Sequence, residues 1–212
     1  MRQKCPDLFS QTKRAVLAFV ALSILCACGS DGQKASPHKR VNVDPAGISM
    51  LQMAAWESDE VDSPEIVLRL KRPMPVVGAP RIDVIVEPIK EKDSHAAFVS
   101  RSLEALKKMV RDKQIRITYE DRRKRKLAGL TITRLRHDWI LLQTASRPAI
   151  SQVSYLFIHE GKAVTVSAAG RTEFFQPFSD DIEEMMQGIR PLRSDEKGGI
   201  EGFSASAKTF FE

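Results

Sequence analysis

All three cysteines of this 212-residue chain, Cys5, Cys26 and Cys28, lie within its first 28 residues. The rest of the chain contains no cysteine, so no disulfide can form there, and thiol catalysis and cysteine-ligated metal are excluded. A domain without disulfides must be held together by a hydrophobic core. The roughly 150 residues that follow the cysteines are enough to bury one.

The start of the chain has the order of a secretory signal. Positive charge on Arg2, Lys4, Lys13 and Arg14 precedes an apolar run at residues 15–25. A spanning helix needs about 20 apolar residues, so this run is too short to cross a bilayer. We therefore expect a cleaved export signal rather than a transmembrane helix.

Residues 25–30 (LCACGS) resemble the lipobox of bacterial lipoproteins, in which an aliphatic and two small residues precede the cysteine that receives lipid. The resemblance implies a signal peptide at residues 1–27, cleavage after Ala27 and a lipid anchor of acyl chains on Cys28. Several chains on one cysteine hold a protein stably at a membrane. Gly29 replaces the aspartate that marks inner-membrane retention, which favours the outer membrane facing the periplasm. The alternative is an ordinary cleaved signal that happens to contain cysteines.

The net charge of +6 overstates the charge of the exported part. The leader contributes four basic residues and one acidic residue, which leaves +3 for residues 28–212. This mild excess, in an exported protein, does not predict a nucleic-acid partner.

Composition divides the exported chain into three parts. Residues 28–47 begin with the lipidated cysteine and are poor in apolar side chains, so we expect a flexible tether. Residues 48–192 carry the patterning of one domain. Residues 193–212 are rich in glycine and serine and predict a flexible tail, although Phe203, Phe210 and Phe211 can instead dock on the domain or a partner.

The domain alternates between the periods of strands and helices. Gly161-Lys162 joins two strongly alternating segments, which predicts a β-hairpin over residues 152–168. Eight strands are expected, at 48–56, 65–70, 82–87, 115–120, 130–136, 140–143, 152–159 and 163–168.

Two amphipathic helices are expected to pack on the sheet. The first begins at a cap on Asp93 or Ser94 and extends to about Arg111. The second is placed at residues 176–189, because Pro177 is tolerated only in a first turn. An earlier start near Thr172 would put this proline inside the helix.

The order of these elements resembles the PsbP and DcrB group. The resemblance rests on Trp56-Glu57, on residues 82–88 (IDVIVEP) and on residues 155–163 (YLFIHEGKA) at the hairpin, and it covers about 145 residues. It implies an α+β fold with an antiparallel sheet flanked by helices, an α/β/α sandwich. The group includes binding and assembly proteins, so the resemblance implies a scaffold more readily than a chemistry.

Five consecutive basic residues form the most unusual stretch of the sequence. They are expected in a loop between two strands, where they can contact an anionic lipid surface, each contributing on the order of 1 kcal/mol. The alternative is a solvated hairpin tip whose charge prevents aggregation. The residues are Arg122, Arg123, Lys124, Arg125 and Lys126.

Residues with catalytic potential are scattered. His137-Asp138 and His159-Glu160 each place an imidazole beside a carboxylate, but adjacent strand residues point to opposite faces, so we expect no catalytic role. The acidic residues at 180–184 are explained by a helix N-terminus rather than a cation site. We expect no cofactor and no metal.

These observations favour a non-enzymatic, lipid-anchored binding or assembly module of the bacterial cell envelope. Its expected partners are the membrane, through lipid on Cys28, and anionic lipid or an envelope protein. The alternative is a chaperone-like accessory of a secretion or envelope machine. A third possibility is a hydrolase-type enzyme with an unrecognised site.

Overall fold

A computed structural model describes residues 38–61, 63–89 and 94–196. The predicted signal peptide, the predicted lipidation site Cys28 and the three phenylalanines of the tail lie outside these described residues. Within the described ranges, no helix is long and apolar enough to cross a membrane.

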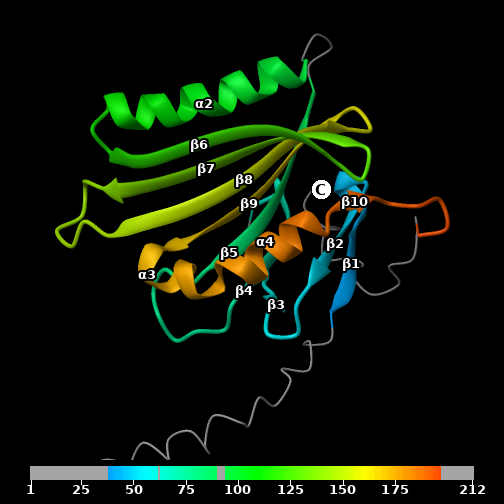
Figure 1. Ribbon diagram of the computed structural model, residues 1–212, viewed down its shortest axis with the longest axis horizontal. Helices are drawn as coiled ribbons and strands as arrows, with labels where there is room; N and C mark the ends of the chain where they lie inside the picture. The colour runs from blue at the N-terminus through cyan, green and yellow to red at the C-terminus, as the bar shows by residue number, and fades with distance from the viewer. Residues whose placement is uncertain (1–37, 62, 90–93, 197–212) are drawn as a thin grey trace, which may run out of the picture. The chain divides into compact units, whose positions relative to one another are not determined.

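A seven-stranded antiparallel sheet forms the centre of the domain (Figure 1). Its spatial order runs from the short strand β3 at one edge to the long strand β6 at the other. In that order the strands are β3 (Glu57–Ser58), β4 (Ile66–Lys71), β5 (Arg81–Pro88), β9 (Lys162–Arg171), β8 (Ala149–His159), β7 (Leu130–Leu141) and β6 (Ile115–Leu127).

The predicted hairpin is confirmed as β8 and β9, which pair from Ile150↔Arg171 to His159↔Lys162. Its two turn residues, Glu160 and Gly161, both have positive φ, at 47° and 70°. A two-residue turn of this kind matches the twist of the flanking strands.

The long pair β6 and β7 corrects two predictions. The separate strands expected at 130–136 and 140–143 are one strand, and the loop expected for residues 122–126 is wrong because these residues belong to β6. The pair runs from Ile115↔Leu141 to Leu127↔Leu130 with one bulge and closes at Ala128-Gly129, where both φ angles are positive. A two-residue turn leaves no room for a basic loop.

A second, three-stranded sheet consists of β1 (Lys39–Val43), β2 (Ile48–Gln52) and β10 (Arg190–Pro191). The 3₁₀ helix η1 (Asp44–Ala46) connects its first two strands. Residues 39–47 are therefore folded, and the tether predicted over 28–47 is wrong in this part. The strand predicted at 48–56 ends at Gln52, ahead of β3.

The chain remains attached to this sheet just beyond β10, where a flexible tail was predicted from residue 193. Glu196 accepts hydrogen bonds from the Arg190 guanidinium and from the Arg193 backbone N–H, which lower the pKa of Glu196 to about 2. Its carbonyl accepts a bond from the Asn42 amide at 3.3 Å.

Two helical segments flank the large sheet. Helix α2 (His95–Arg111) begins where predicted, and the Ser94 hydroxyl accepts a hydrogen bond from the Ala97 N–H at 3.2 Å. The second predicted helix divides into α3 (Thr172–Phe175), η2 (Gln176–Phe178) and α4 (Ser179–Gln187). Pro177 lies in η2, where helix geometry changes, so the segment does start near Thr172 but is not one regular helix.

The core has two parts, one on each face of the large sheet. The larger part packs Trp56, Tyr155 and Phe157 with α4 and the small sheet, and the smaller part packs Phe98 and Val99 of α2 against the opposite face. Figure 1 shows α2 along one face and α4 with the small sheet along the other. The predicted α+β class, an antiparallel sheet flanked by helices, is confirmed.

Candidate functional site

The five predicted basic residues are brought together on β6, but the alternation of the strand divides them between its two faces. Arg122, Lys124 and Lys126 pair with Leu135, Thr133 and Thr131 of β7. Leu135 packs with α2, so these three cations lie on the α2 face of the sheet. Arg123 and Arg125 are on the α4 face, as is Leu127, which packs against the larger core.

The three cations of the α2 face are exposed, and their side chains form no ion pair with the described residues. We call Arg122, Lys124 and Lys126 the basic row. Alternate residues of a strand are about 7 Å apart, so the row extends over about 13 Å. The basic row therefore presents three positive charges, without ion pairs among the described residues, along one edge of the sheet.

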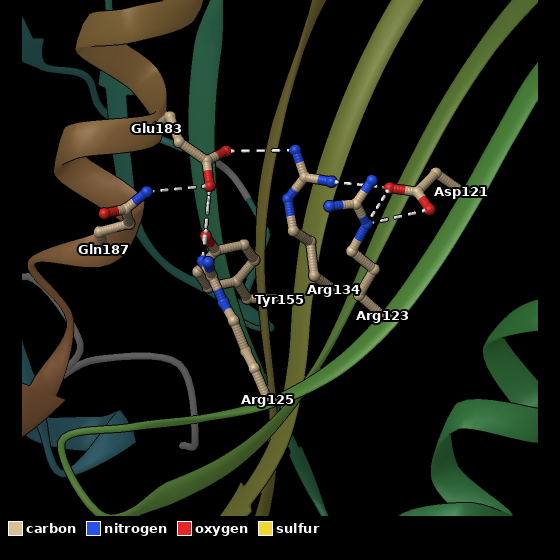
Figure 2. Close-up of polar contacts among 7 residues, drawn as sticks. All are labelled: Asp121, Arg123, Arg125, Arg134, Tyr155, Glu183 and Gln187. Carbon is tan, nitrogen blue, oxygen red and sulfur yellow. Dashed lines mark hydrogen bonds and ion pairs between the residues drawn. The ribbon is translucent and has the colours of Figure 1, made fainter.

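On the other face, four arginines gather in a pocket of about 210 Å³, which we call the arginine pocket. Figure 2 shows three of them, Arg123, Arg125 and Arg134. They come from two strands that pair directly. Tyr119, Asp121 and Glu183 complete the lining, together with Arg123, Arg125, Arg134 and Arg136.

Glu183 of α4 is the shared acceptor of this pocket. Its carboxylate accepts a hydrogen bond from the Tyr155 hydroxyl at 3.0 Å, and it contacts the guanidinium groups of Arg134 at 3.3 Å and Arg125 at 3.5 Å. The Gln187 amide donates to the same carboxylate at 3.3 Å. Figure 2 shows these groups converging between α4 and the two strands.

Asp121 is the second carboxylate of the pocket and lies between two cations. It contacts Arg123 at 2.9 Å and Arg134 at 3.4 Å. Arg134 therefore bridges Asp121 and Glu183, and it links β6 to α4 through one guanidinium group. Its side chain is 14% exposed, so solvent screens this bridge only partly.

The two predicted histidine–carboxylate pairs lie at separate points of the fold, His137 on β7 and His159 at the end of β8. His137 is 4% exposed on the α2 face, its Nε2 lies 4.0 Å from Glu120, and burial lowers its pKa below the usual range. His159 Nε2 lies 3.0 Å from the Gly47 carbonyl oxygen and 3.8 Å from Glu160. His137 also lines a pocket of about 230 Å³ that contains the polar side chains of Gln152 and Ser154.

The acidic residues at 180–184 do not converge either. Asp180 and Asp181 lie in the first turn of α4, as their interpretation as helix N-terminal charges requires. Glu183 turns to the arginine pocket, and Glu184 lies 3.6 Å from His38. No group of histidines and carboxylates suited to a metal occurs among the residues that the structure describes.

Sequence reasoning missed Arg134, Arg136 and Glu183 as parts of this site. Strand register places Arg134 and Arg136 beside β6, and the packing of α4 places Glu183 there. Arg134 and Glu183 are 49 positions apart in the sequence. The available signal was the parity of β6, since Tyr119, Asp121, Arg123 and Arg125 follow one another at every second position.

Comparisons with known proteins bear on the fold. The sequence matches no protein-family model and no curated protein. The solved structure of cyanobacterial PsbP (CyanoP) from Synechocystis sp. PCC 6803 is similar, with a TM-score of 0.56 and 15% identity over 78% of this chain and 97% of that chain. The chain has a PsbP-like fold. LpqN of Mycobacterium tuberculosis, which is involved in cell envelope biogenesis, is similar with a TM-score of 0.53 and 12% identity, over 74% of this chain and 91% of that chain.

Proposed function

We propose that this protein is a non-enzymatic, lipid-anchored binding module of the bacterial cell envelope, and that it meets an anionic membrane surface through the basic row. The observation that carries the proposal is the row itself. Arg122, Lys124 and Lys126 are exposed, aligned on an edge strand and without ion-pair partners among the described residues.

The energy of such a contact is sufficient for a tethered protein. A lysine or arginine near an anionic bilayer contributes on the order of 1 kcal/mol, so three in a row contribute about 3 kcal/mol at low salt. Because its cations do not need to release a carboxylate first, little of this energy is lost to competition within the protein.

The expected anchor would keep the row within reach of the surface. Residues 29–38 lie between Cys28 and the first residue of β1, and a chain of that length spans at most about 35 Å. The folded part begins at β1, earlier than the sequence predicted, so the tether that can link it to Cys28 is shorter. Lipid on Cys28 supplies the attachment, and the row then supplies an orientation. The role of LpqN in cell envelope biogenesis supports an envelope setting.

Binding to vesicles tests the proposal. Residues 28–212 carrying Cys28→Ser, which cannot be acylated, should co-sediment with vesicles of phosphatidylglycerol in phosphatidylcholine, and rising salt should weaken the binding. The variant Arg122→Gln, Lys124→Gln, Lys126→Gln should bind at least about tenfold more weakly.

A matched control changes the same number of charges elsewhere. Lys107, Lys108 and Arg111 are exposed on α2, where Glu104 and Asp112 pair with them. Their replacement by glutamine should leave vesicle binding close to that of the parent chain. Equal losses in both triple variants would show a dependence on net charge alone and would contradict the assignment of the row.

A chaperone-like accessory role is the second candidate, and the long edge strand favours it. β6 has 13 residues and, among the described residues, pairs on one side only, with β7. Exposed strand edges can accept a strand from another protein. A stable protein partner that co-purifies with the Cys28→Ser chain and survives loss of the basic row would support this role instead.

A further inference from the structure

The arginine pocket holds more positive than negative charge. Four guanidinium groups line it, and only two carboxylates, Asp121 and Glu183, face them. The excess is two positive charges within about 210 Å³. We propose that this pocket binds a compact dianion of the phosphate monoester class, whose charge of about −1.5 to −2 matches the excess.

Arg136 is the one arginine of the pocket that forms no ion pair with the residues the structure describes. Asp121 is its partner in strand register, yet the Asp121 carboxylate turns to Arg123 and Arg134 instead. The Arg136 guanidinium lies over the ring of Tyr119, 5.6 Å from its centre, and its Nε is buried without a hydrogen-bond partner. An arginine that lines a pocket without pairing with a carboxylate has guanidinium donors that an oxyanion can accept, so Arg136 favours occupation of the pocket by an oxyanion.

Three of the four ion-pair contacts in the pocket are long for charged hydrogen bonds, whereas Arg123–Asp121, at 2.9 Å, has the usual length. Arg134 is 3.4 Å from Asp121 and 3.3 Å from Glu183, and Arg125 is 3.5 Å from Glu183. Elsewhere in the protein the Arg69–Asp83 pair closes to 2.6 Å, slightly shorter than the usual range of about 2.7–2.9 Å for such bonds. The four arginines of the pocket therefore share two carboxylates through contacts that are mostly long. Some of their guanidinium N–H donors remain available to a bound anion.

Strand register adds repulsion that an anion would relieve. Arg123 lies directly opposite Arg134, and like charges opposite each other destabilise a strand pair. A phosphate group accepts hydrogen bonds on several oxygens at once, and guanidinium groups suit it because each presents paired donors. The volume is below that of pockets for drug-sized ligands, which favours a phosphate group over a larger molecule.

The proposal is independent of the membrane contact, because the pocket and the basic row occupy opposite faces of β6. The phosphate monoester can belong to a soluble molecule or to a lipid headgroup such as that of phosphatidic acid. Both sources present the same chemistry to the arginines. The experiment therefore needs one arm for each source.

Calorimetric titration of inorganic phosphate into the full chain, purified in a non-ionic detergent, is the first arm. Arg136→Gln should weaken phosphate binding about tenfold or more, and Arg136→Lys, which keeps the charge but loses the paired donors, should weaken it less. Arg111→Gln, the same change on α2, should leave it unaltered. Circular dichroism of each variant verifies that the fold is intact.

The second arm uses vesicles and the chain without its basic row. A preference for phosphatidic acid over phosphatidylglycerol at equal surface charge, lost on Arg136→Gln, would assign the lipid headgroup as the source. Phosphate binding without this preference would assign a soluble monoester. Absence of both, or phosphate binding unchanged by Arg136→Gln in a folded protein, would overturn the proposal.

Discussion

The two faces of β6 carry similar residues in different circumstances. On the α4 face, Arg123 and Arg125 share carboxylates with their neighbours in a concave pocket, whereas Arg122, Lys124 and Lys126 on the α2 face are exposed and unpaired among the described residues. The difference arises from parity alone, because successive strand residues point to opposite sides. A basic run is therefore not one functional unit once it lies in a strand.

The largest effect on stability is expected from Glu183→Gln on the pocket face. This change removes the charged acceptor of Arg125, Arg134 and Tyr155. Hydrogen bonds to a charged group contribute about 1.5–3 kcal/mol, so the free energy of unfolding should fall by about 2 kcal/mol in urea denaturation. Phosphate binding should strengthen, because one negative charge leaves the pocket.

Glu184→Gln is the matched control for this change. The neighbouring carboxylate is 54% exposed, and its one ion pair within the described part of the chain is with His38, at 3.6 Å. Its loss should change stability by less than about 0.5 kcal/mol. If the two variants were equally stable, the pocket contacts would not contribute as described.

A smaller loss is expected from Tyr155→Phe. The ring stays in the core, where Tyr155 is fully buried, but the hydroxyl that donates to Glu183 at 3.0 Å is lost. The cost should be about 1 kcal/mol, measured by urea denaturation. Tyr119→Phe, at a ring that is 46% exposed, should cost close to nothing. The reverse order would contradict the role assigned to the Tyr155 hydroxyl.

On the face that carries the basic row, the buried His137 should make the free energy of unfolding depend on pH. Burial lowers the pKa of His137, so the unfolded chain takes up a proton first as the pH falls. The free energy of unfolding should therefore decline as the pH falls below the pKa of histidine in the unfolded chain, about 6.5. The decline should end once the pH is below the lowered pKa of His137 in the folded chain.

Replacement of His137 by glutamine removes this proton uptake. Urea denaturation at pH 7 and pH 5 should then show a smaller loss of stability than in the parent chain. An unchanged loss would mean that His137 does not contribute to the pH dependence.

The smallest effect on stability is expected from the row itself. Replacing Arg122, Lys124 and Lys126 by glutamine breaks no ion pair of the described residues, so the free energy of unfolding should change by less than about 0.5 kcal/mol. A cost above about 2 kcal/mol would show that these cations support the fold rather than a contact with another surface.

Local signals predicted the parts of the fold that local chemistry determines. The β8–β9 hairpin was predictable because alternation and the turn at Gly161 agree, and α2 was predictable from Ser94 and its apolar stripe. The basic run was assigned to a loop because residues 120–126 are all charged and show no alternation of apolar and polar residues. Strand β1 was missed because it is short and largely polar. Its strand conformation depends on pairing with β2, which the sequence of β1 alone does not indicate.

The candidate site was predictable only on one face. Arg122, Lys124 and Lys126 can be identified from the sequence because their role needs only exposure and charge. The pocket needs α4, whose Glu183 is 58 residues from Arg125. No local pattern links these two residues, and only the packed structure brings them together.

Photo-crosslinking in cells that export the full chain tests the central claim most directly. A photoreactive residue at position 124, in the basic row, should form adducts with membrane lipid, whereas the same residue at position 107, on the exposed side of α2, should form few. Equal yields from the two positions, or no lipid adduct at position 124, would contradict a membrane contact through the α2 face of β6.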